Sequence, residues 1–434
     1  MAQLKRFIRD AFSRRNFLFG VLLAGWFAGS SSVEAATVTA TATLKTLNDP
    51  TKAIFSVKSN VLAKAYIEYG YSSGKYTAKS AIITLKAGIA QDLSLLKLTP
   101  GKRVFYRLRY AKSGTSTYLG LKEATLTTPT SFSKATFAIQ ADPHMDENSS
   151  AEVYKGTLAQ IVKAAPAFLI DLGDIFMVDK LQVKSEANIR ARYELMKGYY
   201  KLLGDTPLKI VLGNHDGELG YDTFNTKKYR AEYFPEQTSE LSYYSFTGND
   251  QLHICLDPFT FTVSNPKADG WSWSLGKTQY EWLKTTLEQS TARFKFVYIH
   301  HLLVGDAQSR GGVEIAKFNE WGGLNKDGTA GFAANRAGWY KPVHDLLVEH
   351  KVAAVFKGHD HLYVKQDLGG IVYQTVPQPS HPGDKVDPTQ YGYASGKTVG
   401  GSGFLKVTTS GATATVDFVK FDGSIADSYQ ILVS

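Results

Sequence analysis

Short runs in which apolar and polar residues alternate fill the chain from about residue 37 to residue 129. The runs at 53–57 (AIFSV) and 65–69 (AYIEY) are typical, and glycine and serine residues separate them. Successive side chains of a strand point to opposite faces, so a period of two predicts half-buried β-strands. Many such runs in series predict an N-terminal β-sandwich.

The pattern changes after residues 127–131 (TTPTS), where proline and small polar residues stop both a helix and a central strand. Beyond this linker, short apolar runs alternate with helix-like stretches. In one stretch Tyr280, Leu283 and Leu287 follow helical spacing, which predicts a helix packed on a sheet. We therefore expect a β-sandwich at residues 37–130 and an α/β domain at residues 131–434.

Polar clusters rich in Asp, His and Asn follow five apolar runs, at 136–139, 167–170, 209–212, 295–299 and 352–356. In chain order the clusters are Asp142 and His144; Asp174; Asn214, His215 and Asp216; His300 and His301; and His359, Asp360 and His361. In α/β folds, sites are assembled at the ends of the strands. We therefore expect these clusters to converge at one edge of the sheet.

The chemistry of the clusters indicates a metal site. Carboxylates, imidazoles and one carboxamide are typical ligands of Zn, Mn or Fe, whereas Ca and Mg favour an all-oxygen shell. Residues i and i+2 of an extended segment share a face, so Asp142 can act with His144, and His359 with His361. A glycine before Asp174, Asn214 and His359 permits a sharp turn. A single such motif is more often an ordinary surface or core feature, but five in series predict a site.

The series closely resembles the calcineurin-like metallophosphoesterase superfamily over residues 137–434. The resemblance implies a four-layer α/β/β/α domain that binds two divalent or trivalent metal ions, with Fe, Mn and Zn as the candidates. It implies that one metal is bound by Asp142, His144 and His361, that the other is bound by Asn214, His300 and His359, and that Asp174 bridges the two.

Further segments resemble the purple acid phosphatases. Residues 98–108 resemble the turn and strand of a fibronectin type III module, and residues 279–283, 403–407 and 416–423 resemble the helix and terminal strands of exported members. The sequence departs from the purple pattern at Met177, where those enzymes carry a metal-binding tyrosine, so no tyrosinate-to-iron colour is expected. Whether the sandwich binds a ligand or only packs and spaces the domains stays open.

Leu302 stands where many relatives have proline, which leaves both His300 and His301 as candidate ligands. The family pattern places the ligand directly after the strand, which favours His300.

The resemblance implies an enzyme that hydrolyses phosphate monoesters through attack by a metal-activated water. His215 is then the general acid that protonates the departing alkoxide, or else a support for a metal ligand. Asp216 orients His215 or caps the following turn, and Asp360 hydrogen-bonds a ligand histidine, unless both simply face solvent. Arg310 and Arg336 lie in the Gly-rich stretch 305–339, a candidate lid, where each either pairs with phosphate or is an ordinary surface arginine.

Two other functions stay open. The first is a phosphodiesterase that acts on cyclic nucleotides, nucleic acid or phospholipid head groups, because the same metal core serves both ester types. The second is an inactive binding protein at the cell surface. Against the second, none of the seven implied ligands is replaced. The likeness to purple acid phosphatases and the presence of His215 favour monoesters.

The N-terminus predicts an export signal: basic residues precede an apolar run at 17–28, and a small-residue segment follows with a cleavage site near Ala35 or Ala36. Residues 13–18 (SRRNFL) resemble a twin-arginine signal, with Phe19 where lysine is common. This implies the twin-arginine machinery as partner and a folded protein exported to the periplasm or secreted. A membrane anchor is the alternative, but the run is shorter than the roughly 20 residues of a spanning helix, so we expect no stable span after processing.

Charge and cysteine content add two constraints. The net charge is +9, and residues 1–36 contribute five basic against two acidic side chains, which leaves about +6 on the processed chain. This excess suits anionic substrates such as phosphate esters but is spread too thinly to predict a specific nucleic-acid partner. The single cysteine, Cys255, cannot form an intramolecular disulfide, and its neighbours Ile254 and Leu256 predict a buried strand position.

Overall fold

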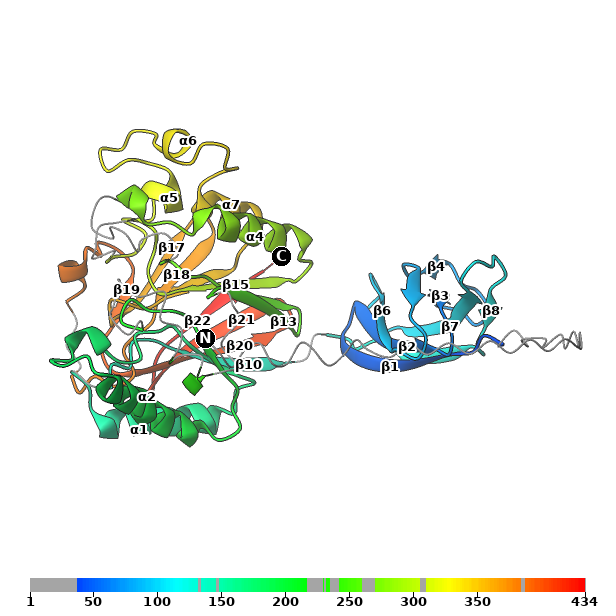
Figure 1. Ribbon diagram of the computed structural model, residues 1–434, viewed down its shortest axis with the longest axis horizontal. Helices are drawn as coiled ribbons and strands as arrows, with labels where there is room; N and C mark the ends of the chain where they lie inside the picture. Colours follow the sequence, from blue (N-terminus) through cyan, green and yellow to red (C-terminus); the bar gives the residue numbers. More distant parts are fainter. Residues whose placement is uncertain are drawn as a thin grey trace, which may run out of the picture.

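The computed structural model describes residues 37–131, 134–145, 148–216, 229, 232–234, 242–259, 270–304, 310–383 and 387–433. Figure 1 shows strands β1 to β9 in a small lobe and the later elements in a larger α/β lobe. The predicted export signal, residues 1–36, lies outside the described residues. Among the described helices, none is long and apolar enough to cross a bilayer.

The small lobe consists of two antiparallel sheets around one core. Alternate residues point into this core, including Phe55, Ile67 and Leu108, so the predicted period-two strands are confirmed. One sheet has the order β1 (Ala40–Asp49), β2 (Lys52–Ser59), β6 (Gln91–Leu95). The other contains β3 (Ala63–Gly70), β4 (Ala78–Lys79), β5 (Ile83–Leu85), β7 (Arg103–Lys112), β8 (Leu119–Gly120) and β9 (Ala124–Thr127).

The larger lobe contains two mixed sheets. The six-stranded sheet has the order β12 (Leu208–Ile210), β11 (Leu169–Asp171), β10 (Ala135–Gln140), β20 (Gly403–Ser410), β21 (Thr413–Lys420), β22 (Ile425–Leu432). The seven-stranded sheet has the order β13 (Tyr244–Gly248), β14 (Gln251–Cys255), β15 (Phe294–Ile299), β16 (Ala354–Lys357), β18 (Ile371–Thr375), β17 (Tyr363–Leu368), β19 (Lys397–Val399). All five apolar runs that precede the polar clusters form strands, as predicted.

The two sheets pack face to face, and helices cover both outer faces. Phe137, Phe356 and Val407 belong to the core between the sheets. Helices α1 (Ala151–Ala164) and α2 (Glu186–Tyr200) pack on the outer face of the six-stranded sheet. Helices α4 (Gly276–Gln289) and α7 (Val343–Glu349) pack on the seven-stranded sheet. The predicted four-layer α/β/β/α domain is therefore confirmed.

Two local predictions are also confirmed. Helix α4 buries Tyr280, Leu283 and Leu287 on one face, as their spacing predicted. Cys255 is fully buried in β14, and burial raises the pKa of its thiol to about 12. A thiol in this position packs as a small apolar side chain.

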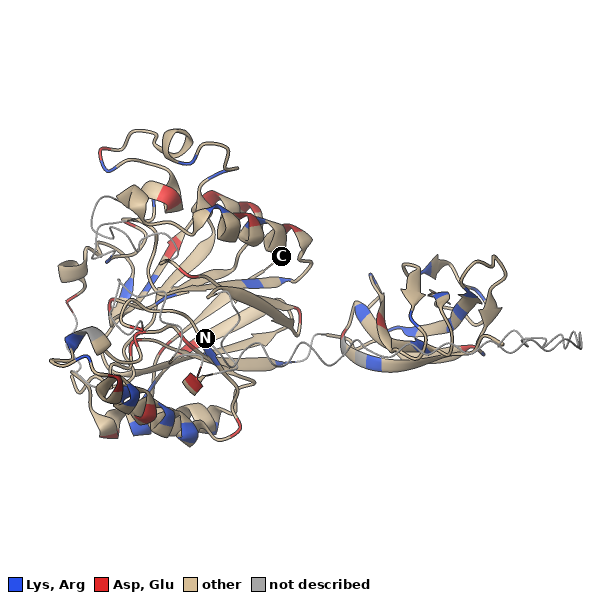
Figure 2. Ribbon diagram, viewed as in Figure 1, with Lys and Arg blue, Asp and Glu red and all other residues tan. Residues whose placement is uncertain are grey.

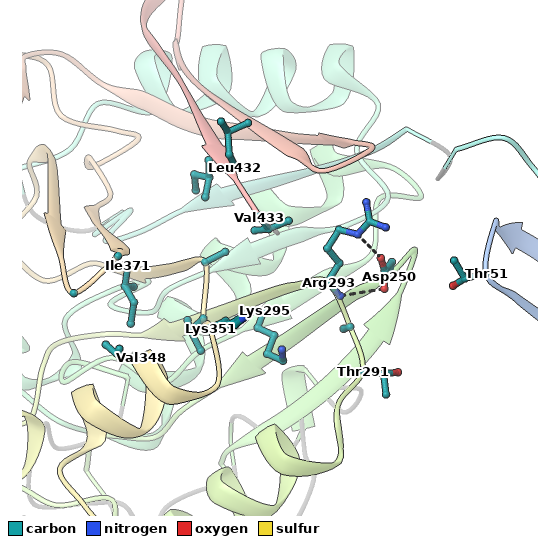
Figure 3. Close-up of a pocket in the computed structure, with 16 residues that line it drawn as sticks. Thr51, Asp250, Thr291, Arg293, Lys295, Val348, Lys351, Ile371, Leu432 and Val433 are labelled. Carbon is teal, nitrogen blue, oxygen red and sulfur yellow. Dashed lines mark hydrogen bonds and ion pairs between the residues drawn. The ribbon is translucent and has the colours of Figure 1, made fainter. Parts of the chain in front are cut away.

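A cavity of about 510 Å³ opens beside the amino ends of β15 and β16, shown in Figure 3. Its cationic lining residues are Arg293, Lys295 and Lys351, and Arg293 pairs with Asp250 at 3.4 Å between Nε and Oδ2. Burial lowers the pKa of Lys295, and the charge of Lys351 adds to this effect. The polar clusters follow the opposite, carboxyl ends of these strands, so this cavity contains none of the predicted site residues.

His253 is a buried histidine in the core between the two sheets. Its Nε2 lies 3.0 Å from Gln251 Oε1, which only accepts hydrogen bonds, so Nε2 carries the proton. The hydroxyl of Tyr298 then donates to Nδ1 at 2.9 Å. Phenylalanine rings from both sheets contact the imidazole, and burial lowers its pKa to about 3. The neutral ring is therefore part of the packed core.

We predict that His253→Phe weakens the loss of stability in acid. Unfolded His253 takes up a proton below about pH 6.5, whereas the folded side chain resists protonation until about pH 3. His253 therefore lowers the free energy of unfolding by roughly 1.4 kcal/mol for each pH unit that the pH falls between these two values. Urea unfolding of the wild type and the variant at several pH values in this range measures how the free energy of unfolding of each depends on pH. Tyr298→Phe, which retains the histidine, should keep the wild-type slope, and an unchanged slope in His253→Phe would contradict this account.

Candidate metal centre

The loops after five strands bring the seven predicted ligands to one edge of the two sheets. Two groups each place three ligand atoms within 4.8 Å of one another. The first group is Asp142, His144 and His361, and the second is Asp174, His300 and His359. The amide oxygen of Asn214 lies 3.0 Å from His300 Nε2, beside the second group. All seven predicted ligands therefore converge.

Asp174 lies between the two groups. Its Oδ2 is 3.1 Å from His300 Nε2 and 3.7 Å from His144 Nε2, while its Oδ1 accepts the N–H of His215 at 2.7 Å. One carboxylate oxygen is thus held by the backbone, and the other faces both groups. This is the position expected of a bridging carboxylate.

Asp142 is anchored in the same way. Its Oδ2 accepts the N–H of His359 at 2.8 Å. Its Oδ1 is buried, lies 3.5 Å from His361 Nε2 and 3.8 Å from His144 Nε2, and has no hydrogen-bond partner among the described residues. The same part of the chain offers no hydrogen-bond partner to the buried Nε2 of His144. Such atoms are costly to bury unless a ligand binds them, so this donor set fits a cation.

The backbone at this edge is strained. Asp142, His144, Asp174, His359 and His361 have φ values of 56°, 41°, 53°, 73° and 60°. We expected Asp142 and His144, and likewise His359 and His361, to share one face of an extended segment, and this was wrong. Left-handed turns aim the side chains inward instead. Each such residue costs on the order of 1–3 kcal/mol, a strain that proteins keep mainly at functional sites.

Two glycines allow the loops after β11 and β12 to touch. Gly173 has a φ of 94°, which glycine adopts without strain. A Cβ at Gly213 would lie 2.2 Å from the backbone nitrogen of Asp174. The predicted sharp turn therefore applies to Gly173, whereas Gly213 is required for close approach.

Asp216 joins the same two loops. Its buried carboxylate accepts backbone N–H groups from Gly213 at 2.7 Å, Asp174 at 2.8 Å and Ile175 at 2.9 Å. His215, the predicted general acid, is partly exposed, and its ring centroid is 5.5 Å from that of His144. Asp216 thus fixes the loop that presents His215 at the mouth of the site.

His300, and not His301, stands with the other predicted ligands. His300 Nδ1 donates to the carbonyl of Leu172 at 2.9 Å, which leaves Nε2 directed at Asp174 and Asn214. The ring of His301 packs against Phe259 and Trp273, with centroids 4.9 and 4.6 Å apart, and belongs to neither group.

The site attracts positive charge. Burial alone would raise the pKa of Asp142, but the neighbouring imidazoles of His144, His361 and His300 hold it well below its ordinary value. Burial alone would lower the pKa of His300, but the Asp174 and Asp142 carboxylates raise it to about 9. Burial lowers the pKa of His359 and His361. Two buried carboxylates beside imidazoles such as His359 and His361, whose pKa is lowered, are suited to binding metal cations.

Asp360 does not hydrogen-bond a ligand histidine, which corrects our prediction. Its Oδ2 accepts from Lys357 Nζ at 2.7 Å, from the Tyr393 hydroxyl at 2.6 Å and from the Gly311 N–H at 3.0 Å. The buried lysine neutralises the carboxylate and fixes the turn that carries His359 and His361. Neither Lys357 nor Tyr393 was predicted from the sequence as a partner of Asp360. A lysine that ends an apolar strand is a usable signal, but nothing in the sequence links Tyr393 to this turn.

The two candidate arginines have different surroundings. Arg310 Nη1 donates to the carbonyl of His359 at 2.9 Å, so Arg310 borders the site. Arg336 pairs with the fully buried Glu320, Nε to Oε2 at 2.5 Å, and donates to the carbonyl of Trp271 at 2.6 Å. These bonds indicate that Arg336 stabilises the fold. The predicted lid stretch contains short helices α5 (Asn319–Gly322) and α6 (Phe332–Asn335), and its residues 305–309 lie outside the described residues.

Comparison with known protein families and structures gives the following matches. A family model described as calcineurin-like phosphoesterase matches residues 135–363, just over half of the chain. The fold is similar to a purple acid phosphatase from yellow lupin (Lupinus luteus), at 15% identity and a TM-score of 0.47, covering 90% of this chain and 74% of that one. It is also similar to a structure of PhoD (12% identity, TM-score 0.46, covering 88% and 87%) and to a dimetal phosphatase from Danio rerio (12%, 0.46, covering 69% and 99%). Among curated proteins no match was found.

We predict that Arg336→Met destabilises the fold without emptying the site. The change leaves the Glu320 carboxylate buried without its cation, which should cost about 3–5 kcal/mol. Lys284→Gln, which removes a surface pair with Glu288 on α4, should leave the free energy of unfolding almost unchanged. Urea unfolding and metal analysis of both variants test this. A fully stable Arg336→Met protein that lost affinity for phosphate esters would instead place Arg336 in the substrate site.

Proposed function

The chain belongs to the calcineurin-like phosphoesterase family, and from this premise we propose that it is an exported dinuclear-metal enzyme that hydrolyses phosphate monoesters. One observation carries the proposal: two groups of ligand atoms converge at one edge of the sheets, and the Asp174 carboxylate faces both. A single metal would need only one group. The shared carboxylate is what a two-metal site requires.

Asp142, His144 and His361 would hold one metal, and Asn214, His300 and His359 the other, with Asp174 bridging. The unpartnered buried atoms Asp142 Oδ1 and His144 Nε2 support this assignment. Carboxylate, imidazole and carboxamide donors suit Fe, Mn or Zn. When bound, the two metals would neutralise phosphate oxygens and lower the pKa of a water so that it can attack phosphorus.

The protein's own residues position the reaction. His215 lies at the mouth of the site, where its imidazole would donate a proton to the leaving oxygen. Asp216 holds the His215 loop through three backbone bonds, and Lys357 with Tyr393 holds Asp360 between two proposed ligands. Arg310 borders the site and is the cation that we assign to substrate phosphate oxygens, in addition to its bond to His359.

Export rests on the N-terminal sequence. Residues 13–18 resemble a twin-arginine signal, and the twin-arginine route carries folded proteins. We propose that the enzyme acquires its metals before export and works in the periplasm or outside the cell.

We predict that Asp174→Asn prevents binding of the complete metal pair and strongly slows hydrolysis. The amide loses the negative charge that both groups of ligand atoms face, so bound metal should fall below two per chain and turnover of p-nitrophenyl phosphate should drop roughly 100-fold or more. Asp345→Asn, an exposed change on α7, should retain both. Metal analysis and kinetics of the Mn-, Zn- and Fe-loaded chains test this. Metal-loaded, folded wild type that hydrolysed neither p-nitrophenyl phosphate nor its bis ester would favour the binding-protein hypothesis.

We predict that His215→Gln slows hydrolysis in proportion to the basicity of the leaving group. A general acid matters most for an alkoxide and least for p-nitrophenolate, which departs without a proton. The loss for an alkyl phosphate should reach about 10²- to 10⁴-fold, with little loss for p-nitrophenyl phosphate and an unchanged metal content. Equal losses for both esters together with lost metal would show instead that His215 supports a ligand. Activity greater on bis-p-nitrophenyl phosphate than on the monoester would replace our substrate assignment with a phosphodiesterase.

A further inference from the structure

The positive charge of the chain is concentrated in the N-terminal sandwich. Residues 37–130 contain fourteen Lys and Arg against four Asp and Glu, a net charge of +10, whereas residues 131–434 contain thirty against thirty-four, a net charge of −4. The excess of positive charge is therefore not spread thinly over the chain, contrary to our expectation. Figure 2 shows the basic positions on the strands of the small lobe.

The few acidic side chains of the sandwich are already engaged. Glu68 pairs with Arg107 and Arg109, and Asp92 pairs with Lys45. Asp49 and Glu123 accept hydrogen bonds from neighbouring residues of the module. Within the described residues, eleven of the fourteen cations therefore have no carboxylate partner. Such a module attracts a polyanion.

One end of the sandwich, which we call the tip, combines cations with exposed apolar side chains. Three connections form it, at residues 59–62, 86–90 and 112–117, and backbone bonds hold them together: the Gly88 N–H donates to the Ser59 carbonyl at 2.7 Å, and the Ser113 N–H to the Leu62 carbonyl at 2.9 Å. Leu62 and Ile89 are 50% and 53% exposed. The exposed lysines Lys58, Lys86 and Lys112 lie on or beside these connections, which contain no acidic residue.

The tip faces away from the α/β lobe. In the β1–β2 hairpin Ala40 pairs with Ser59 at the tip, and Asp49 pairs with Lys52 at the far end. The linker to the α/β lobe leaves from the far end. The Leu98 N–H bonds to the Thr51 carbonyl beside the β1–β2 turn, and the nearby Gly101 N–H bonds to the carbonyl of Pro129 in the linker. Strand β1 has ten residues, so the two ends lie roughly 30 Å apart.

The chain enters the sandwich at the tip. Asn60 binds both Thr37 and Thr39 there. Eight residues separate Thr37 from the apolar run 17–28 of the export signal, a reach of at most about 28 Å. During export, before the predicted cleavage near Ala35 or Ala36, a chain whose signal lies in the membrane would therefore hold the tip near the bilayer.

From these observations we infer that the tip of the sandwich binds the surface of a bilayer containing anionic phospholipids. Lys58, Lys86 and Lys112 would meet the headgroup phosphates, and Leu62 and Ile89 would enter the interface between headgroups and acyl chains. Exposed leucine and isoleucine side chains gain more from entering the interface between headgroups and acyl chains than from contact with a sugar-phosphate backbone or an anionic glycan, which is why we favour a lipid surface. The inference is independent of the proposed hydrolytic activity.

The test is vesicle flotation of the chain beginning at Thr37, which retains every described element. Wild type should float with vesicles of phosphatidylglycerol and phosphatidylcholine in equal amounts and remain unbound with phosphatidylcholine alone. Lys58→Gln/Lys86→Gln/Lys112→Gln should weaken binding roughly 10- to 100-fold, as the loss of three surface cations implies. Leu62→Ser/Ile89→Ser should weaken it about tenfold with the charge unchanged.

A matched control removes the same charge from the far end. Lys75, Lys97 and Lys102 are exposed there, beyond the roughly 10 Å over which salt at 0.1 M screens charge, so their triple change to Gln should bind almost as wild type does. Thermal unfolding confirms that each variant folds. Equal losses in the two triple variants, or no binding to anionic vesicles, would overturn the inference. Binding of a double-stranded DNA fragment is the alternative outcome. That result would assign the tip to nucleic acid if binding were lost in the tip-lysine triple variant and unchanged in Leu62→Ser/Ile89→Ser.

Discussion

Two buried carboxylates at one edge of the sheets, Asp142 and Asp174, are the constraint on which the rest of the α/β lobe depends. Each is fully removed from solvent, and each has one oxygen held by a backbone N–H and the other directed at imidazoles. Buried charge is unfavourable unless a cation or hydrogen bonds compensate it. The strained turns and the closely packed loops after β11 and β12 are tolerated because they bring that compensation within reach.

The support for this edge comes from elements far apart in the sequence. Asp216 fixes the loops after β11 and β12, whereas Lys357, Tyr393 and Gly311 fix Asp360 after β16. Both anchors are carboxylates that bind neighbouring loops and leave the proposed ligands free to turn inward. The site is therefore positioned by hydrogen bonds between loops as much as by the strands themselves.

The strands and the proposed ligands were predictable because each apolar run is short, almost wholly apolar and followed by a polar cluster. The backbone shape of the clusters was not, since an Asp-x-His spacing looks the same in an extended segment and in a left-handed turn. The partners of Asp360 were missed for a related reason: Tyr393 lies 33 positions away, and only the fold brings it close. The pairing of Arg336 with Glu320 was hidden because an arginine in a Gly-rich stretch suits substrate binding and structural roles equally.

The uneven charge of the two lobes has a consequence for how the molecule orients itself. A lobe of +10 joined to a lobe of −4 forms a large electric dipole, which experiences a torque near any charged boundary. At a negatively charged surface the sandwich is attracted toward the surface, and the α/β lobe is repelled toward the aqueous phase. The chain would then stand upright, and its substrates would reach it from the solution and not along the surface that holds it.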